Sequence, residues 1–198
     1  MSSLLIFLSS TLVLISPFIY ARAILKGEAK PHRTTRFVLF IIAALSTATL
    51  FANGNTVAVW LAGANLVQGA IILGLSLKYG MGGWAKIDLA CLAIALIGII
   101  AWQTTKNPLI GLYCSILADF TGMVPTLIKT YRLPKTEIAT FFALDIFAAL
   151  FSTLATHQWT MEQLAYPLYI GLINAIMVTL ILWPRPKTVP VSNDHNVQ

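Results

Sequence analysis

The chain has 198 residues, of which 58% are apolar and only 10% are charged, with a net charge of +6 and a mean hydropathy of +0.80. Soluble domains carry about 25% charged residues. The composition therefore argues against a soluble enzyme, a nucleic-acid-binding domain and a disordered chain, and it favours a multi-spanning membrane protein.

Seven apolar segments follow one another along the chain, and each is close to the roughly 20 residues that a bilayer-crossing helix needs. They cover residues 3–21, 37–53, 56–77, 86–104, 108–129, 138–156 and 163–183. Charged or turn-forming residues separate them. We predict an all-α integral membrane protein with seven transmembrane helices, followed by a disordered cytoplasmic tail at 185–198.

The basic residues alternate between the two sides of this predicted bundle. Lys106 stands alone on one side. The other side holds the remaining basic residues, Arg22, Lys26, Lys30, Arg33, Arg36, Lys78, Lys86, Lys129, Arg132, Lys135, Arg185 and Lys187. Because Lys and Arg collect in cytoplasmic loops, we expect a multi-pass cell-membrane protein with its N-terminus outside and its C-terminus in the cytoplasm. The same loops are expected to bind anionic lipid headgroups.

The second half of the chain repeats features of the first. Residues Phe37–Leu45 match Phe142–Leu150 at an offset of 105, and the first and fifth segments each carry a proline, Pro17 and Pro125, near the cytoplasmic end. An odd number of helices in the linker keeps both units in the same orientation. We therefore expect two parallel repeats of the kind found in transporters, in which substrate binds near the midplane.

This arrangement divides the chain into a first three-helix repeat at 1–80, a linker helix at 81–105 and a second three-helix repeat at 106–184. Amides lie midway along the third and seventh segments, Asn65 and Gln68 in the third and Asn174 in the seventh.

With these features the chain resembles the SWEET / PQ-loop (MtN3-like) superfamily of 3+1+3 helix transporters. It departs from the family in its Pro-Gln dipeptides, which read Pro17-Phe18 and Pro125-Thr126 here. The resemblance implies a central cavity that opens alternately to either side, with Pro17 and Pro125 as hinges. It also implies that Asn65 and Asn174 face each other across the cavity and, with Gln68, contact the substrate. A static kink is the alternative for both prolines.

Two acids lie inside apolar segments, where a charge is costly and needs a reason. Asp119 is halfway along the fifth segment, and Asp145 is about two turns into the sixth. We expect them at similar depth on neighbouring helices, with Asp145 on a stripe of small residues that faces other helices. One or both acids are predicted to bind a proton, a cation or a cationic part of the substrate. The alternative is a neutral, hydrogen-bonded acid that ties helices together.

The sequence thus favours a small-solute transporter that works by alternating access, either proton-coupled or specific for an amine-bearing solute. A SWEET-like sugar facilitator and a non-transporting seven-helix receptor or sorting protein remain alternatives. No catalytic residue pair, metal-ligand spacing or cofactor motif occurs, so we expect no enzyme activity, metal or cofactor. No nucleic-acid partner is expected, and a homo-oligomer is left open.

Overall fold

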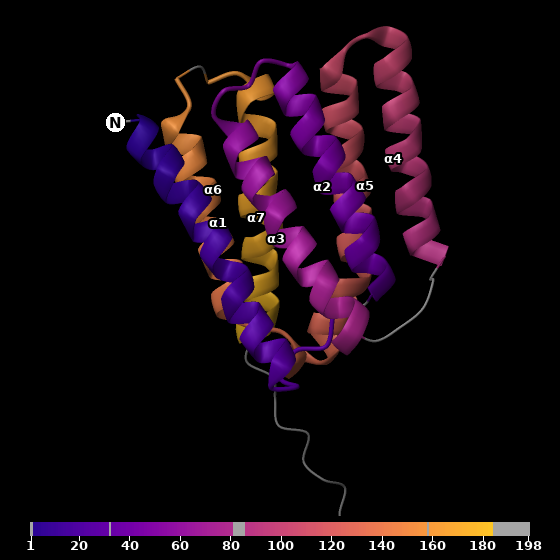
Figure 1. Cartoon of the computed structure of the whole chain (residues 1–198), viewed down its shortest axis with the longest axis vertical. Helices are drawn as coiled ribbons and strands as arrows, with labels where there is room; N and C mark the ends of the chain where they lie inside the picture. Colours follow the sequence, from indigo (N-terminus) through magenta and orange to yellow (C-terminus); the bar gives the residue numbers. More distant parts are fainter. Residues whose placement is uncertain (1, 32, 81–85, 158, 184–198) are drawn as a thin grey trace, which may run out of the picture.

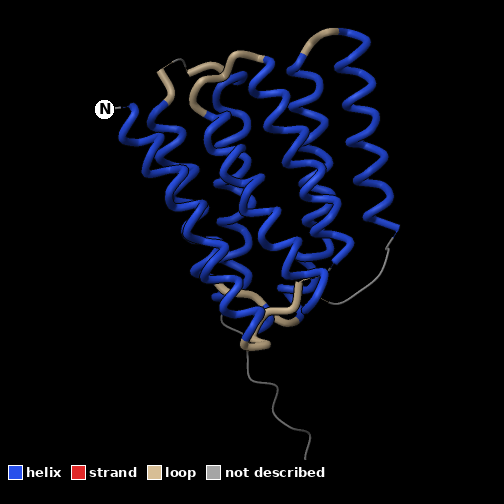
Figure 2. Tube along the Cα trace, viewed as in Figure 1, coloured by secondary structure: helices blue, strands red, loops and turns tan. Residues whose placement is uncertain are grey.

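A computed structural model describes residues 2–31, 33–80, 86–157 and 159–183 of the chain. The described residues form seven α-helices and one 3-10 helix that run up and down side by side, without a strand among them (Figures 1 and 2). The helices are α1 Ser2–Leu25, α2 Arg33–Ala52, α3 Ala58–Tyr79, α4 Lys86–Thr105, α5 Pro108–Arg132, η1 Pro134–Thr136, α6 Ala139–Ala155 and α7 Met161–Leu182. The predicted tail and residues 81–85 of the predicted linker lie outside the described residues.

The lengths and apolarity of the helices are those of a membrane protein. α1, α2, α3, α5 and α7 are each long and apolar enough to cross a bilayer. α6 has only 17 residues, and the apolar part of α4 is Leu92–Thr105. Large apolar side chains also cover the outside of the bundle, as Phe51 at 78% exposure illustrates. Such a surface suits a lipid environment and would be unstable in water.

Several helices extend beyond the apolar segments that predicted them. Arg33 and Arg36, which the sequence places in a loop, lie in the first turn of α2, and α5 continues through Lys129 to Arg132. Long basic side chains can remain in a helix at a membrane surface because their apolar stems lie along the protein while the charge reaches polar surroundings. The apolar pattern therefore predicted where the helices lie but underestimated the lengths of α2 and α5.

The packing order differs from the order along the chain. α1 packs against α3 and α6, whereas α2 packs against α3 and α5. α7 contacts both α5 and α6, and α4 lies at one edge of the bundle against α5 and α2 (Figure 1). Within the described ranges α5 and α6 make no contact, so the expectation that Asp119 and Asp145 lie on neighbouring helices is wrong. Their helices are consecutive in sequence and separated in space.

Of three apolar clusters among the described residues, two lie toward the two ends of the bundle, and the third packs α4 against α2 and α5. We call the end with the α1–α2 and α5–α6 connections, residues 26–32 and 133–138, the basic end. One cluster, which includes Tyr20, Phe141 and Met177, lies toward the basic end. The other, which includes Leu50, Leu61 and Leu112, lies toward the opposite end. Buried polar side chains occur at both ends of the bundle and between them, as Asn55, Glu137 and Gln68 illustrate.

Candidate functional site

A cavity of about 120 Å³ lies inside the bundle, with walls from α2, α3, α5, α6 and α7. This volume is several times what one water molecule needs. All five residues that the sequence predicts as binding or coupling residues line it, namely Asn65, Gln68, Asp119, Asp145 and Asn174. The structure thus brings together side chains from four helices that are far apart in sequence.

Asp145 joins three helices at the wall of this cavity. It lies on α6 with 3% exposure, and its two oxygens have different partners. Ser16 Oγ of α1 lies 3.1 Å from Oδ1, and Gln68 Nε2 of α3 donates to Oδ2 at 3.0 Å. The small residues that follow it on the same face, Ala148, Ala149 and Ser152, are buried as expected. Asp145 therefore connects α6 to the first half of the chain.

Asp119 has its partner within the second half of the chain. Tyr169 of α7 donates its hydroxyl proton to Asp119 Oδ2, so the contact connects α5 to α7. Asp119 and Asp145 have the same kind of hydrogen-bond partner, namely hydroxyl and amide groups rather than cations. Hydroxyl groups and amides can both donate and accept. Each acid is consequently able to keep a hydrogen-bonded partner whether it is charged or protonated.

The three amides differ in how far their hydrogen-bonding capacity is used. Asn65 Nδ2 lies 3.5 Å from the Tyr166 hydroxyl, and Asn174 Nδ2 donates to the Ile170 carbonyl of its own helix at 2.8 Å. Gln68 is 5% exposed, and its Oε1 is buried without a hydrogen-bond partner in the described part of the protein. An unpaired buried acceptor is costly. The cavity therefore offers a buried acceptor for a donor group that enters it.

Asn65 and Asn174 do not lie at the same level. Both α3 and α7 begin at the end opposite the basic end, and Asn65 is in the first half of α3 whereas Asn174 is in the second half of α7. Asn174 is therefore deeper toward the basic end. Asn65 and Asn174 therefore line one cavity at different depths and do not face each other as expected.

Pro17 and Pro125 lie inside α1 and α5 and are not among the residues that line the cavity. Pro17 directly follows Ser16, so the proline of α1 is adjacent in sequence to a hydrogen-bond partner of Asp145. The structure also has Pro167 inside α7, which was not among the predicted hinges. The hinge role of Pro17 and Pro125 stays a prediction.

Three further lining residues were missed by the sequence analysis. Tyr166 and Tyr169 lie one turn apart on the cavity-facing side of α7, and Arg36 lines the cavity from α2. A helical spacing of tyrosines and Asn174 along one face of α7 was the available signal for the first two. Arg36 was counted as a loop residue because it precedes the apolar run. Arg36 thus lines the same cavity as Asp119 and Asp145.

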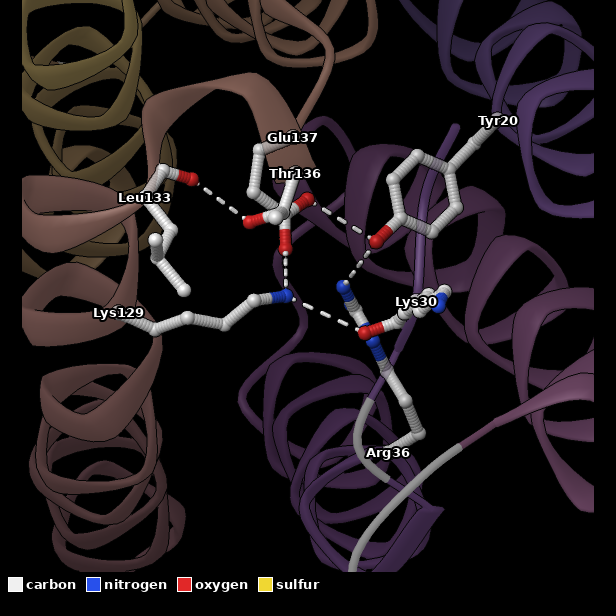
Figure 3. A network of polar contacts seen from close by, with 7 residues as sticks. All are labelled: Tyr20, Lys30, Arg36, Lys129, Leu133, Thr136 and Glu137. Carbon is white, nitrogen blue, oxygen red and sulfur yellow. Dashed lines mark hydrogen bonds and ion pairs between the residues drawn. The ribbon is translucent and has the colours of Figure 1, made fainter. Parts of the chain in front are cut away.

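A network of polar contacts closes the basic end of the bundle (Figure 3). Glu137, whose side chain is 1% exposed, pairs with Lys129 Nζ at 3.0 Å and accepts a hydrogen bond from the Tyr20 hydroxyl at 3.0 Å. Arg36 Nη2 donates to the same Tyr20 hydroxyl at 3.3 Å, and Lys129 also donates to the Lys30 carbonyl. The network therefore ties α1 and α2 to α5 and the α5–α6 connection.

The chain matches no protein-family model, no curated protein and no solved structure. The function is accordingly inferred from the cavity itself, its partners and its position in the bundle.

Proposed function

We propose that this protein is a small-solute transmembrane transporter that works by alternating access and is coupled to protons. The observation that carries the proposal is the polar cavity inside the bundle, whose lining also includes residues of both apolar clusters. It contains two acids without a cationic hydrogen-bond partner, three amides and an unpaired acceptor on Gln68. Polar groups inside a membrane bundle are expensive and typically mark a path for a solute or an ion.

The contacts between helices support the 3+1+3 repeat architecture of the SWEET / PQ-loop superfamily. If α1, α2 and α3 are exchanged with α5, α6 and α7, the contact of α1 with α6 becomes the contact of α5 with α2. The contacts of α1 with α3 and of α2 with α3 become those of α5 with α7 and of α6 with α7. All of these contacts occur, and α4 lies outside this exchange. The proposed spans are therefore seven, with α4 as linker.

The partners of the two acids support proton coupling. An arginine or lysine in contact with a carboxylate would hold it in its charged form. Ser16, Gln68 and Tyr169 impose no such restriction, since each can donate to a carboxylate or accept from a carboxylic acid. An acid in this setting is suited to binding and releasing a proton as the cavity changes the side to which it opens.

The basic residues support the orientation in the membrane. The described Lys and Arg side chains lie at the basic end, with the exception of Lys106 in the α4–α5 connection. The positive-inside tendency then places the basic end in the cytoplasm and the N-terminus outside, in a cell membrane. Anionic headgroups are the proposed partners of the exposed side chains at this end.

An uptake screen in proteoliposomes tests the proposal. The purified protein is reconstituted, and sugars, amino acids and vitamins are offered with and without an inwardly directed proton gradient. We expect at least one solute to accumulate faster with the gradient than without it. Gradient-independent exchange of a sugar would favour a facilitator instead. Saturable binding without counterflow of any solute would contradict transport and favour a receptor.

A further inference from the structure

We propose that Ser16 connects the protonation of Asp145 to the bend of α1 at Pro17, because one hydroxyl proton serves two acceptors. Ser16 Oγ lies 3.1 Å from Asp145 Oδ1 and 3.1 Å from the Val13 carbonyl oxygen. A serine hydroxyl has a single proton to donate. At any moment only one of these two oxygens can receive it.

The Val13 carbonyl needs this proton because of the proline that follows. In a regular helix each carbonyl accepts from the amide four residues later, and for Val13 that residue is Pro17, which has no N–H. Both Ser16 and Pro17 are buried, and a carbonyl without a donor is costly in the membrane interior. Ser16 is therefore the local replacement for the backbone hydrogen bond that Pro17 removes.

The protonation state of Asp145 decides where the serine proton points. When Asp145 is ionised, its Oδ1 attracts the Ser16 proton, and the Val13 carbonyl loses its donor. When Asp145 takes up a proton from the cavity, the new carboxylic O–H donates to Ser16 Oγ, and Ser16 turns its own proton to Val13. The new O–H bond on Asp145 is the only covalent change; the remaining changes are in hydrogen bonds. The Val13 carbonyl of α1 therefore has a hydrogen-bond donor only when Asp145 is protonated.

Other titratable groups near Asp145 are separable from this relay. From α1 and α3 it meets the uncharged Ser16 and Gln68. The titratable groups that line the same cavity are Arg36 of α2, Asp119 of α5, and Tyr166 and Tyr169 of α7. Tyr20, one turn beyond Ser16 on α1, pairs with Glu137 at the basic end. Neither the cavity-lining groups nor the Tyr20–Glu137 pair involves the Ser16 hydroxyl. A pH response of α1 that depends on Ser16 therefore identifies the relay.

The inference deepens the proposed function and rests on it for its meaning in a transport cycle, but its test needs no solute. Spin labels at Leu4→Cys and Leu25→Cys, in a chain whose two native cysteines are replaced, report the bend of α1 by their separation. Both sites are about 60% exposed. They lie near opposite ends of the helix, roughly 30 Å apart at a rise of about 1.5 Å per residue. The distance is measured in liposomes at about pH 5 and about pH 9, a range wide enough for a buried acid to titrate.

We expect the distance to differ between the two pH values in the otherwise unchanged chain. Asp145→Asn, whose amide can donate to Ser16, should show the acidic distance at both pH values. Ser16→Ala should show the alkaline distance at both. Pro17→Ala restores the backbone donor to Val13 and should make the distance independent of pH while leaving both Asp145 and Ser16 in place.

Ser9→Ala is the matched control. Ser9 is also buried on α1 and bonds to α6, through the Ala148 carbonyl at 2.7 Å, but no acid is involved. It should retain the pH response. An unresponsive parent chain, or a response that persists in Ser16→Ala, would overturn the relay. Size-exclusion profiles check that each variant is folded. If Ser16→Ala does not fold, Pro17→Ala still tests the proposal. Because solute uptake plays no part, failure of the relay and failure of transport are distinguished.

Discussion

At the scale of single residues, the buried acids fall into two chemical kinds. Glu137 is held by an ion pair with Lys129 and by a hydrogen bond from the Tyr20 hydroxyl. Asp119 and Asp145 have hydroxyl and amide partners, and Arg36 is the cation among the described residues that line their cavity. The difference in partners favours a structural role for Glu137 at the basic end and is the reason that the two aspartates are the proposed sites of proton exchange.

Glu137→Gln should destabilise the protein because it removes the negative charge that pairs with the partly buried ammonium group of Lys129. The expected loss is about 1–3 kcal/mol, the usual range for a hydrogen bond that involves a charged group. The midpoint of thermal unfolding in detergent, at a fixed scan rate, measures it. Glu28→Gln is the matched control, because Glu28 and Lys26 are 4.0 Å apart and more than half exposed. An equal effect of both substitutions would contradict the structural role of the network.

The sequence predicted the cavity residues that interrupt an apolar run, because a polar group there has to be satisfied inside the bundle. Asp119, Asp145 and the three amides belong to this class, and all line the cavity. It did not identify Arg36, which a charge count assigns to the loop, or Ser16, whose importance comes from a contact with a helix 129 residues away. Such partners follow from packing, and hydropathy contains no information about them.

At the scale of helices, close approach depends on a few glycines. A Cβ atom added at Gly111 of α5 would lie 2.5 Å from Thr49 Cγ2 of α2 and 3.4 Å from Trp102 Cβ of α4. Small residues at such positions allow membrane helices to pack backbone to backbone. Gly74 of α3, by contrast, has no atom of the described protein within 4 Å of where its Cβ would be.

Gly111→Ala should therefore separate α5 from α2 and α4 and lower stability by about 1–3 kcal/mol, the cost typical of an overpacked site. Gly74→Ala makes the same chemical change on an open surface and should be neutral or slightly stabilising, since alanine favours helix more than glycine does. Thermal unfolding of the two variants in the same detergent measures the difference. A greater loss from Gly74→Ala would contradict the packing of α5.

The positions of the helices along the chain were predictable, but which helices pack against each other was not. Runs of apolar residues located each of the seven described α-helices, because membrane spans have a required length and apolarity, and they missed the short 3-10 helix η1. The ends were displaced where basic residues continue a helix, as in α2 and α5. The separation of α5 from α6 was not predictable, since proximity in sequence is a poor guide to contact in a bundle that interleaves its two halves.

At the scale of the whole molecule, the uneven distribution of charge gives the bundle a direction. Lys135 is exposed in η1 at the basic end, and Lys106 is exposed in the α4–α5 connection at the opposite end (Figure 1). If the proposed orientation is correct, these two lysines lie on opposite sides of the membrane. The N-terminus then lies on the side of Lys106.

Cysteine labelling tests this orientation. In a chain without native cysteines, Lys106→Cys should react with a membrane-impermeant maleimide in intact cells, whereas Lys135→Cys should react only after the cells are permeabilised. The two variants are each other's control, since each replaces one exposed lysine. The reverse pattern would place the basic end outside, and equal labelling of both in intact cells would indicate that the chain does not span the membrane as proposed.

The central claim is that protons and a solute pass through the cavity together, with Asp145 as the acid that makes the coupling possible. Its most direct test is proton-driven uptake by Asp145→Asn in proteoliposomes, with the solute found in the screen and with Glu28→Gln as a control that neutralises an exposed acid. We predict that Asp145→Asn abolishes the stimulation of uptake by the proton gradient, while Glu28→Gln retains it. Stimulation by the gradient that is unchanged in Asp145→Asn would contradict the account.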